Sequence, residues 1–286
     1  MEINKMSILN RLFTRNMLRH FIDGKEDNVY LSVVRRYATD VDKKTNREII
    51  SEIYCKLKKN YRNEYFYKNT LLNKLLLGVH SVNTTTALTE VPIAKSKADF
   101  VLINGKAIVY EIKTELDNLE RLSSQIDDYY KVFDHVAVVT YEKNLQQLQN
   151  VLNHFDKPVG IYVLRRNESL GTIKKPGRYI GDLDKEIIFK LLRKNEYEKL
   201  IYEWYGYLPE VTQFKYYSAC KSMFLQIPIE ESYLLVLKLL KQRVRLEKEQ
   251  FFKMPYELKF LAYFMELSYD EYQKLNMFLD RQLGGV

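Results

Sequence analysis

The sequence predicts an α/β protein in which a mixed central sheet is flanked by helices, with helical regions before and after it. Two observations predict this class. Short β-rich apolar runs bounded by turn signals cover residues 86–93, 97–103, 106–114, 135–141 and 158–164. Segments with helical periodicity separate the later runs, and the order strand, helix, strand, helix, strand is typical of a sheet with a partly parallel edge.

The expected helices follow from apolar periodicity and from start and stop signals. Residues 2–22 combine apolar and basic side chains at helical spacing. The string Thr45-Asn46-Arg47-Glu48 predicts a capping box at the start of another helix. Further helices are expected over about 64–77, with Gly78 as the C-terminal cap, over 116–133 and over 143–155.

From about Leu183 onward the pattern is helical almost to the end. We therefore expect three consecutive segments: a basic helical N-terminal region (1–44), an α/β core (45–182) and a helical C-terminal region (183–286). No run of 18 apolar residues exists, so no membrane-spanning helix is expected. Cys55 and Cys220 show no metal-ligand spacing, which predicts two reduced, buried thiols in a cytoplasmic protein.

The positive charge of the chain is concentrated near its start. The net charge is +8, and the first 80 residues alone carry 16 Lys and Arg against 9 Asp and Glu, a balance of +7. A localised basic region is the electrostatic footprint of a polyanionic partner such as nucleic acid. A solvated helical surface is the alternative, and charge alone does not decide between the two.

Charged residues stand at the ends of two apolar runs that flank the turn Asn104-Gly105. Asp99 opens the first run, and Glu111 and Lys113 close the second. Burying these charges is costly unless they pair or bind a metal ion. Carboxylates and backbone carbonyls suit a hard cation such as Mg²⁺, and a lysine beside it can act on a water molecule and offset negative charge. A metal-held water that attacks a phosphodiester fits this set.

The length of the turn sets a condition on this interpretation. A two-residue hairpin loop would pair Asp99 with Tyr110 and point Asp99 away from Glu111. A three-residue loop or a bulge shifts the register by one residue and brings the two acids to one face. Asn104-Gly105 suits both options, so the hypothesis requires the odd-length loop.

The Asp99 strand, the turn and Glu111-Ile112-Lys113 resemble the PD-(D/E)xK nuclease superfamily. The region over about 45–165 is similar to a bacterial family within it, known mostly from genome sequences. Ala98 stands where the superfamily's naming proline would be, and Glu90 matches an acid that precedes the Asp strand. The shared helix signature consists here of Asp117, Leu119, Arg121, Leu122, Gln125, Tyr129, Phe133 and Asp134.

The resemblance implies that residues 45–182 form a restriction-endonuclease-like core. It implies that Asp99, Glu111 and the carbonyl of Ile112 hold Mg²⁺ or Mn²⁺, and that Lys113 acts on the attacking water. Glu90 would complete the acidic cluster. Three helix residues, Arg121, Gln125 and Tyr129, are four apart and share one face. Gln125 would fix Lys113 or a substrate phosphate, and Arg121 and Tyr129 would bind substrate.

Three classes of function remain open. The first is a metal-dependent nuclease with DNA as the expected polymer and defence against foreign DNA as one candidate role. The second is a catalytically inactive nuclease-like fold that binds nucleic acid through the basic N-terminal helices. The third is a subunit that docks a protein partner or a second copy of itself through the C-terminal helices, where residues 231–250 are strongly amphipathic.

Each candidate residue also has a plain structural interpretation. Glu111 and Lys113 would then form an ordinary ion pair, Tyr129 would be a core aromatic residue, and Arg121 would be surface charge. The presence of Asp99, Glu111 and Lys113 together favours the nuclease.

Overall fold

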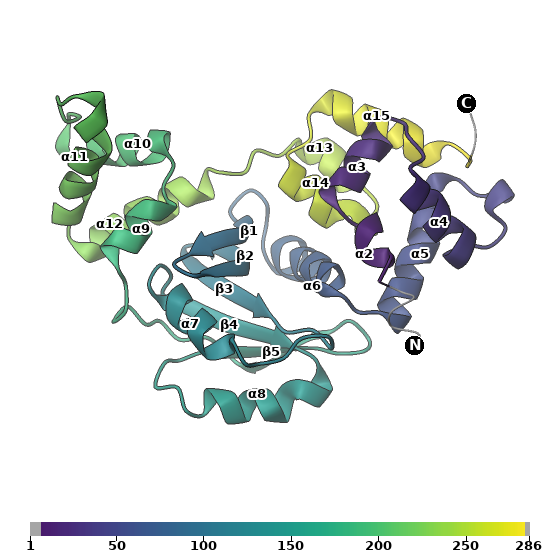
Figure 1. Ribbon diagram of the computed structural model, residues 1–286, viewed down its shortest axis with the longest axis horizontal. Coiled ribbons are helices and arrows are strands. Elements are labelled where there is room, and N and C mark those ends of the chain that lie inside the picture. Colours follow the sequence, from purple (N-terminus) through teal and green to yellow (C-terminus); the bar gives the residue numbers. More distant parts are fainter. Residues whose placement is uncertain (1–6, 284–286) are drawn as a thin grey trace. The chain divides into compact units, whose positions relative to one another are not determined.

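The computed structural model describes residues 7–283 of the chain, and these form two compact units. The helical unit combines the chain up to Val79, residues 114–116 and the chain from Val244. The sheet unit comprises residues 80–113 and 117–243 (Figure 1). Among the described residues, no helix has the length and apolar character needed to cross a membrane. The three-segment division of the chain stays a prediction.

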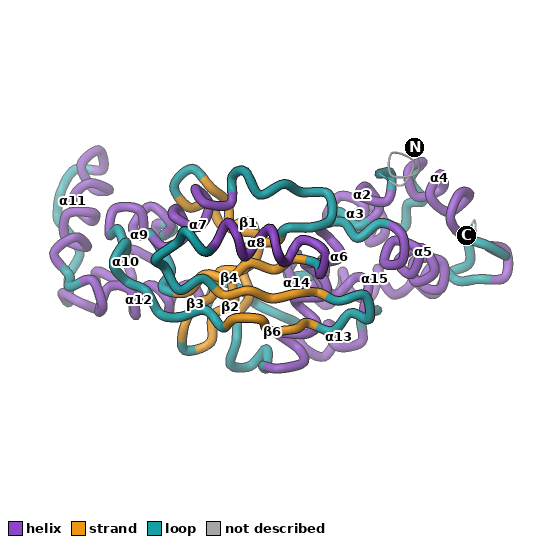
Figure 2. The backbone as a smooth tube through the Cα atoms, turned by 90° about the horizontal axis from the view of Figure 1, so that it is seen from below, coloured by secondary structure: helices purple, strands orange, loops and turns teal. Residues whose placement is uncertain are grey.

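The sheet contains six strands that lie in sequence order, β1-β2-β3-β4-β5-β6. The pairs β3–β4 and β4–β5 are parallel and the other three are antiparallel, which confirms the expected α/β class with a mixed sheet. Figure 2 shows the strands of this sheet in orange. The strands are β1 (Thr86–Ile93), β2 (Ser96–Asn104), β3 (Lys106–Ile112), β4 (His135–Thr140), β5 (Gly160–Leu164) and β6 (Leu170–Lys174).

Helices connect the parallel strands, because parallel neighbours need a crossover rather than a tight turn. Helix α7 (Leu122–Tyr130) leads from β3 to β4 and packs against β2 and β4. After β4, the short η3 (Glu142–Asn144) and α8 (Leu145–Leu152) lead to β5. Every residue of β4 is buried, as its continuous apolar run requires.

The later part of the sheet unit is helical, as expected after about Leu183. Helix α9 packs against β1 and α12 packs against β2. The helices are α9 (Lys185–Leu191), α10 (Lys194–Tyr205), α11 (Gln213–Gln226) and α12 (Ile229–Lys241).

The helical unit joins the two ends of the chain. Helix α15 packs against α3 and α5, and the buried Asn46 side chain donates a 3.0 Å hydrogen bond to the carbonyl of Phe278. The early elements are α2 (Leu9–Leu12), α3 (Arg15–Ile22), α4 (Asn28–Tyr37), η1 (Val41–Lys43), α5 (Asn46–Asn60), α6 (Glu64–Leu71) and η2 (Leu72–Val79). The late elements are α13 (Lys248–Lys253), η4 (Tyr256–Leu258), α14 (Lys259–Met265) and α15 (Tyr269–Asp280).

The capping box expected at Thr45 is confirmed, and it makes a stability prediction possible. The Glu48 N–H donates to Thr45 Oγ1, and the Glu48 carboxylate accepts from the Thr45 N–H. Thr45→Ala should therefore lower the free energy of unfolding by about 1 kcal/mol, the usual cost of losing an N-cap. Urea denaturation measures this change. Thr14→Ala, which removes the cap of the shorter α3, is the comparison, and an unchanged midpoint for Thr45→Ala would contradict the expectation.

Several element boundaries differ from the expectations. The N-terminal segment breaks between α2 and α3 at Phe13-Thr14, and residues 2–6 of the expected helix lie outside the described residues. Gly78 is not a C-terminal cap, because α6 continues into the π-helical turns of η2 as far as Val79. Helix α7 begins only at Leu122, after turns over residues 115–121.

Two other features were not expected. Strand β6 is an edge strand whose residues are largely exposed, so it lacks the apolar run that predicted the others. Both cysteines are free, as predicted, but Cys55 is exposed and only Cys220 is buried. The reason is that Cys55 follows the apolar stripe of α5, whose buried members include Ile53, Tyr54 and Leu57, and points away from it.

Candidate functional site

The connection between β2 and β3 has the odd length that the candidate site requires. Asn104 pairs with Lys106, which leaves Gly105 alone at the tip. Gly105 has a φ of 69°, in the left-handed region that favours glycine. The last residue pair of the β2–β3 ladder is Phe100 with Tyr110. The next position along both strands sets Asp99 opposite Glu111, and opposite residues share a face of the sheet. The expected odd-length loop is therefore confirmed.

Asp99 is held by both neighbouring strands. Its Oδ2 atom accepts a 2.9 Å hydrogen bond from the backbone N–H of Ile112 on β3. Its carbonyl oxygen accepts a 2.8 Å hydrogen bond from the hydroxyl of Thr89 on β1. The first bond orients the carboxylate and the second fixes the main chain that carries it.

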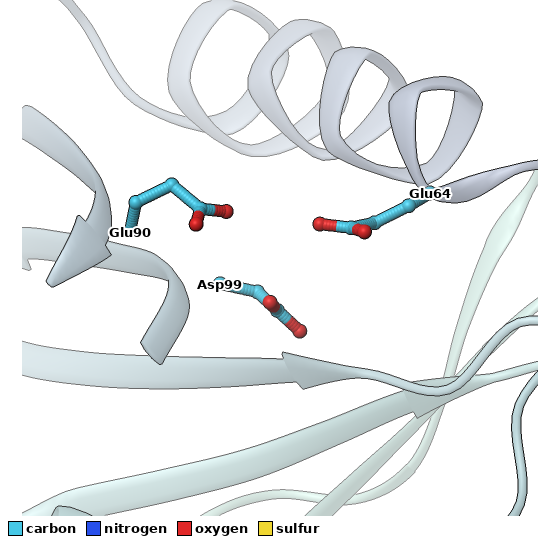
Figure 3. A group of neighbouring side chains, drawn as sticks. All are labelled: Glu64, Glu90 and Asp99. Carbon is cyan, nitrogen blue, oxygen red and sulfur yellow. The ribbon is translucent and has the colours of Figure 1, made fainter. Parts of the chain in front are cut away.

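Glu90 lies across the β1–β2 hairpin from Asp99 and has an unusual backbone. Its φ of 55° places it in the left-handed region, in the middle of a strand. For a residue other than glycine this conformation costs about 1–3 kcal/mol, and such strain is concentrated at functional sites. One carboxylate oxygen of Glu90 and one of Asp99 lie within 4.8 Å of each other (Figure 3). Glu90 also pairs with the Lys97 ammonium group.

Glu111 and Lys113 form a buried ion pair at the end of β3. The Lys113 Nζ atom lies 3.0 Å from Glu111 Oε1, and the two side chains are only 9% and 2% exposed. Lys113 also donates a 2.8 Å hydrogen bond to Gln125 Oε1, and the Tyr129 hydroxyl donates a 2.5 Å hydrogen bond to Glu111 Oε2. Helix α7 thus gives each member of the pair one further partner.

Tyr129 lies behind Glu111 and is fully buried. Burial raises the pKa of Tyr129 far above its usual value, and the Glu111 charge and the hydrogen bond to it raise it further. The phenol therefore stays protonated and remains a donor to the carboxylate. Tyr129 was expected to bind substrate, whereas its hydroxyl lies against Glu111 and the carbonyl of Lys97.

Asp128 is a residue that the sequence analysis missed. Its Oδ2 atom accepts hydrogen bonds from the Ser96 hydroxyl at 2.8 Å and from the Lys95 N–H at 3.2 Å. Burial alone would raise the pKa of Asp128, but hydrogen bonds from Lys131 and Ser96 bring it below its usual value. Asp128 thereby fastens α7 to the turn between β1 and β2. An acid within a helix carries no signal of such a role in the sequence.

The remaining predicted residues lie at the start of α7 and the end of β3. Arg121 is exposed, and its guanidinium group makes no hydrogen bond or ion pair with another described residue. It is therefore available to a phosphate group. Ile112 donates its N–H to Asp99, while the role of its carbonyl as a metal ligand stays a prediction.

Comparison with known proteins places the chain in a phage-protein family. The family model described as "Bacteriophage P4 protein cII" matches residues 57–262. The chain belongs to the bacteriophage P4 protein cII family. The cII match includes every candidate residue from Glu90 to Tyr129.

Protein cII of Enterobacteria phage P4 is 26% identical to the chain over 145 residues, which are 49% of this chain and 50% of the phage protein. The chain therefore spans about half the length of this curated cII relative. No solved structure matches the chain at a significant level.

Proposed function

We propose that this cII-family chain is a metal-dependent nuclease of the PD-(D/E)xK type that hydrolyses phosphodiester bonds of DNA in the cytoplasm. The β2–β3 register carries the proposal, because it sets Asp99 opposite Glu111 with Lys113 on the same strand face as Glu111. The six-stranded mixed sheet is compatible with a restriction-endonuclease-like core.

The donor set fits a hard divalent cation. Oxygen ligands of one Mg²⁺ ion lie about 3–4 Å apart, and the oxygens of Glu90 and Asp99 are already within 4.8 Å. Glu90, Asp99, Glu111 and the Ile112 carbonyl are the groups that would hold Mg²⁺ or Mn²⁺. When bound, the ion would polarise a phosphoryl oxygen and lower the pKa of a coordinated water.

The residues around Glu111 have separate tasks in this proposal. Lys113 offers a positive charge that offsets the negative charge developing on the phosphate, and Gln125 fixes the position of its ammonium group. Tyr129 orients the Glu111 carboxylate by donating a hydrogen bond to it. The exposed Arg121 binds a phosphate of the substrate.

The ion pair between Glu111 and Lys113 favours a second candidate function. Because these two charges satisfy each other, the same geometry suits a nuclease-like fold that only binds nucleic acid. Purified chain should be incubated with single- and double-stranded DNA and RNA, with Mg²⁺, with Mn²⁺ and with chelator. Cleavage that needs both the ion and Asp99 supports the nuclease, and binding without cleavage supports the second candidate.

Replacing Arg11, Arg15 and Arg19 with glutamine should weaken nucleic-acid binding broadly across sequences. All three side chains are exposed, and each lost phosphate contact should lower the salt dependence by about 0.9 in the slope of log K against log salt. Arg19 already pairs with Glu271, so Arg11 and Arg15 should account for most of the effect. Fluorescence anisotropy at several salt concentrations measures this.

The control for this triple variant carries the same charge change on the sheet unit. It replaces the exposed Lys143, Lys175 and Lys190 with glutamine. Equal loss of affinity in the two triple variants would leave the N-terminal helices with no special role in binding.

A further inference from the structure

We propose that the sheet unit has a second ligand site, a pocket that binds a phosphomonoester at the opposite end of β3 from the candidate nuclease site. The pocket has a volume of about 370 Å³, within the range of small-molecule sites. Lys106, at the start of β3, lines it, whereas Ile112 ends that strand beside Asp99. The two ends of β3 are about 20 Å apart at the usual rise of a strand.

His135 supplies the central donor of this pocket in its imidazolium form, in which Nδ1 donates to the Asp134 carboxylate and Nε2 carries the second proton. It is the first residue of β4 and is only 6% exposed. Its Nδ1 atom lies 2.8 Å from Asp134 Oδ1, while its Nε2 atom has no hydrogen-bond partner among the described residues. A carboxylate on one ring nitrogen orients an imidazole and leaves the other nitrogen directed at a ligand. Because His135 lines the pocket, Nε2 is the atom available to that ligand.

Asp134 serves to hold His135 in place. Its Oδ1 atom accepts a 2.7 Å hydrogen bond from the Tyr233 hydroxyl, and its N–H donates to the same hydroxyl at 3.1 Å. Burial alone would raise the pKa of Asp134, but the hydrogen bonds from His135 and Tyr233 bring it below its ordinary value. The carboxylate therefore stays ionised and keeps its hydrogen bonds from His135 and Tyr233.

Two further cations line the pocket. Lys106 is exposed and has no ion-pair partner among the described residues. Arg178 is 55% exposed and makes only loose pairs, at 3.6 Å, with Asp134 and with Glu230, which also lines the pocket. Neither guanidinium contact is a close hydrogen bond, so Arg178 can turn to an anion.

The chemistry of the lining selects the ligand. Three separate donors, the imidazolium form of His135, Lys106 and Arg178, suit the three terminal oxygens of a phosphomonoester better than the two oxygens of a carboxylate. Leu234 and Leu237 of α12 add an apolar wall for the organic part. The phosphate could belong to a free nucleotide or to the 5′ end of a nucleic acid, and the site does not depend on the nuclease proposal.

The test is a binding titration of the full chain labelled with ¹³C at its four histidines, without divalent ions. AMP and inorganic phosphate are added separately, and the His135 resonance is identified by its absence in His135→Gln. We expect this resonance to shift saturably with both probes. No saturable shift up to tens of millimolar of either probe would overturn the proposal.

Substitutions at two exposed residues should change the affinity for AMP in opposite directions, and neither substitution alters a buried residue. Arg178→Gln should weaken AMP binding by about tenfold, as for the loss of one charge-assisted hydrogen bond. Glu230→Gln should tighten it, because a competing negative charge is removed. Shifts in the same direction, or none, would contradict the site.

Two further probes identify the source of the phosphate. A 5′-phosphorylated hexanucleotide that shifts the His135 resonance, while its 5′-hydroxyl counterpart does not, assigns the site to nucleic-acid ends. A shift with AMP and with neither hexanucleotide assigns it to free nucleotides. Equal shifts with both hexanucleotides would show that internal phosphates suffice and would overturn the phosphomonoester assignment.

Discussion

Asparagine in place of Asp99 should remove divalent-ion binding at the candidate site and lower the cleavage rate by more than about 10³-fold. The reason is that a bound metal ion supplies several kcal/mol of transition-state stabilisation. The change removes one carboxylate charge but keeps an oxygen that can accept the hydrogen bond from Ile112. The variant should therefore stay folded, and the lower cleavage rate should come from the missing metal ligand.

Two measurements on the same preparation check this prediction. Calorimetry measures Mn²⁺ binding, and a nuclease assay measures the cleavage rate. Asp156→Asn is the matched control, because it makes the same change at an exposed residue of the sheet unit. Asp99→Asn protein that still binds the ion as the wild type does would remove Asp99 from the metal site. Retained cleavage would in addition reject the proposed nuclease centre.

The strands of the site were predictable because their signals are local. The turn Asn104-Gly105 and the apolar runs on either side indicate the hairpin, and the requirement that Asp99 face Glu111 selects the odd-length loop. The structure has that loop, with Gly105 in the left-handed conformation at its tip. Lys113 was one of the two partners expected for Gln125, the other being a substrate phosphate, and the structure has the contact to Lys113.

Other parts of the site depend on long-range packing that no local pattern reports. Glu90 has a left-handed backbone in the middle of β1, and its own side chain gives no sign of it. Asp128 becomes a buried acceptor only because α7 lies against the turn at Lys95 and Ser96. Tyr129 was assigned to substrate because spacing along a helix does not show how deeply a face is buried.

Alanine in place of Lys113 should lower the cleavage rate by about 10²–10³-fold while leaving divalent-ion binding intact or stronger. Lys113 is a cation and binds no metal, but its charge offsets the negative charge of the transition state. Its removal also frees the Glu111 oxygen that now faces the ammonium group. Single-turnover cleavage and Mn²⁺ calorimetry separate the two effects, and Lys143→Ala at an exposed position is the matched control.

Stability needs a separate measurement, because the variant leaves Glu111 buried without its partner. Breaking a buried pair in this way costs about 3–5 kcal/mol. The double variant Glu111→Gln/Lys113→Met removes both charges and should recover much of that stability, since Tyr129 can still donate to the glutamine oxygen. If the pair is only structural, Lys113→Ala will lose stability and, once shown to be folded, will cut at the wild-type rate. If Lys113 stabilises the transition state, Lys113→Ala that is shown to be folded will still cut about 10²–10³-fold more slowly than the wild type. The double variant also loses the Glu111 carboxylate, so it reports on stability alone.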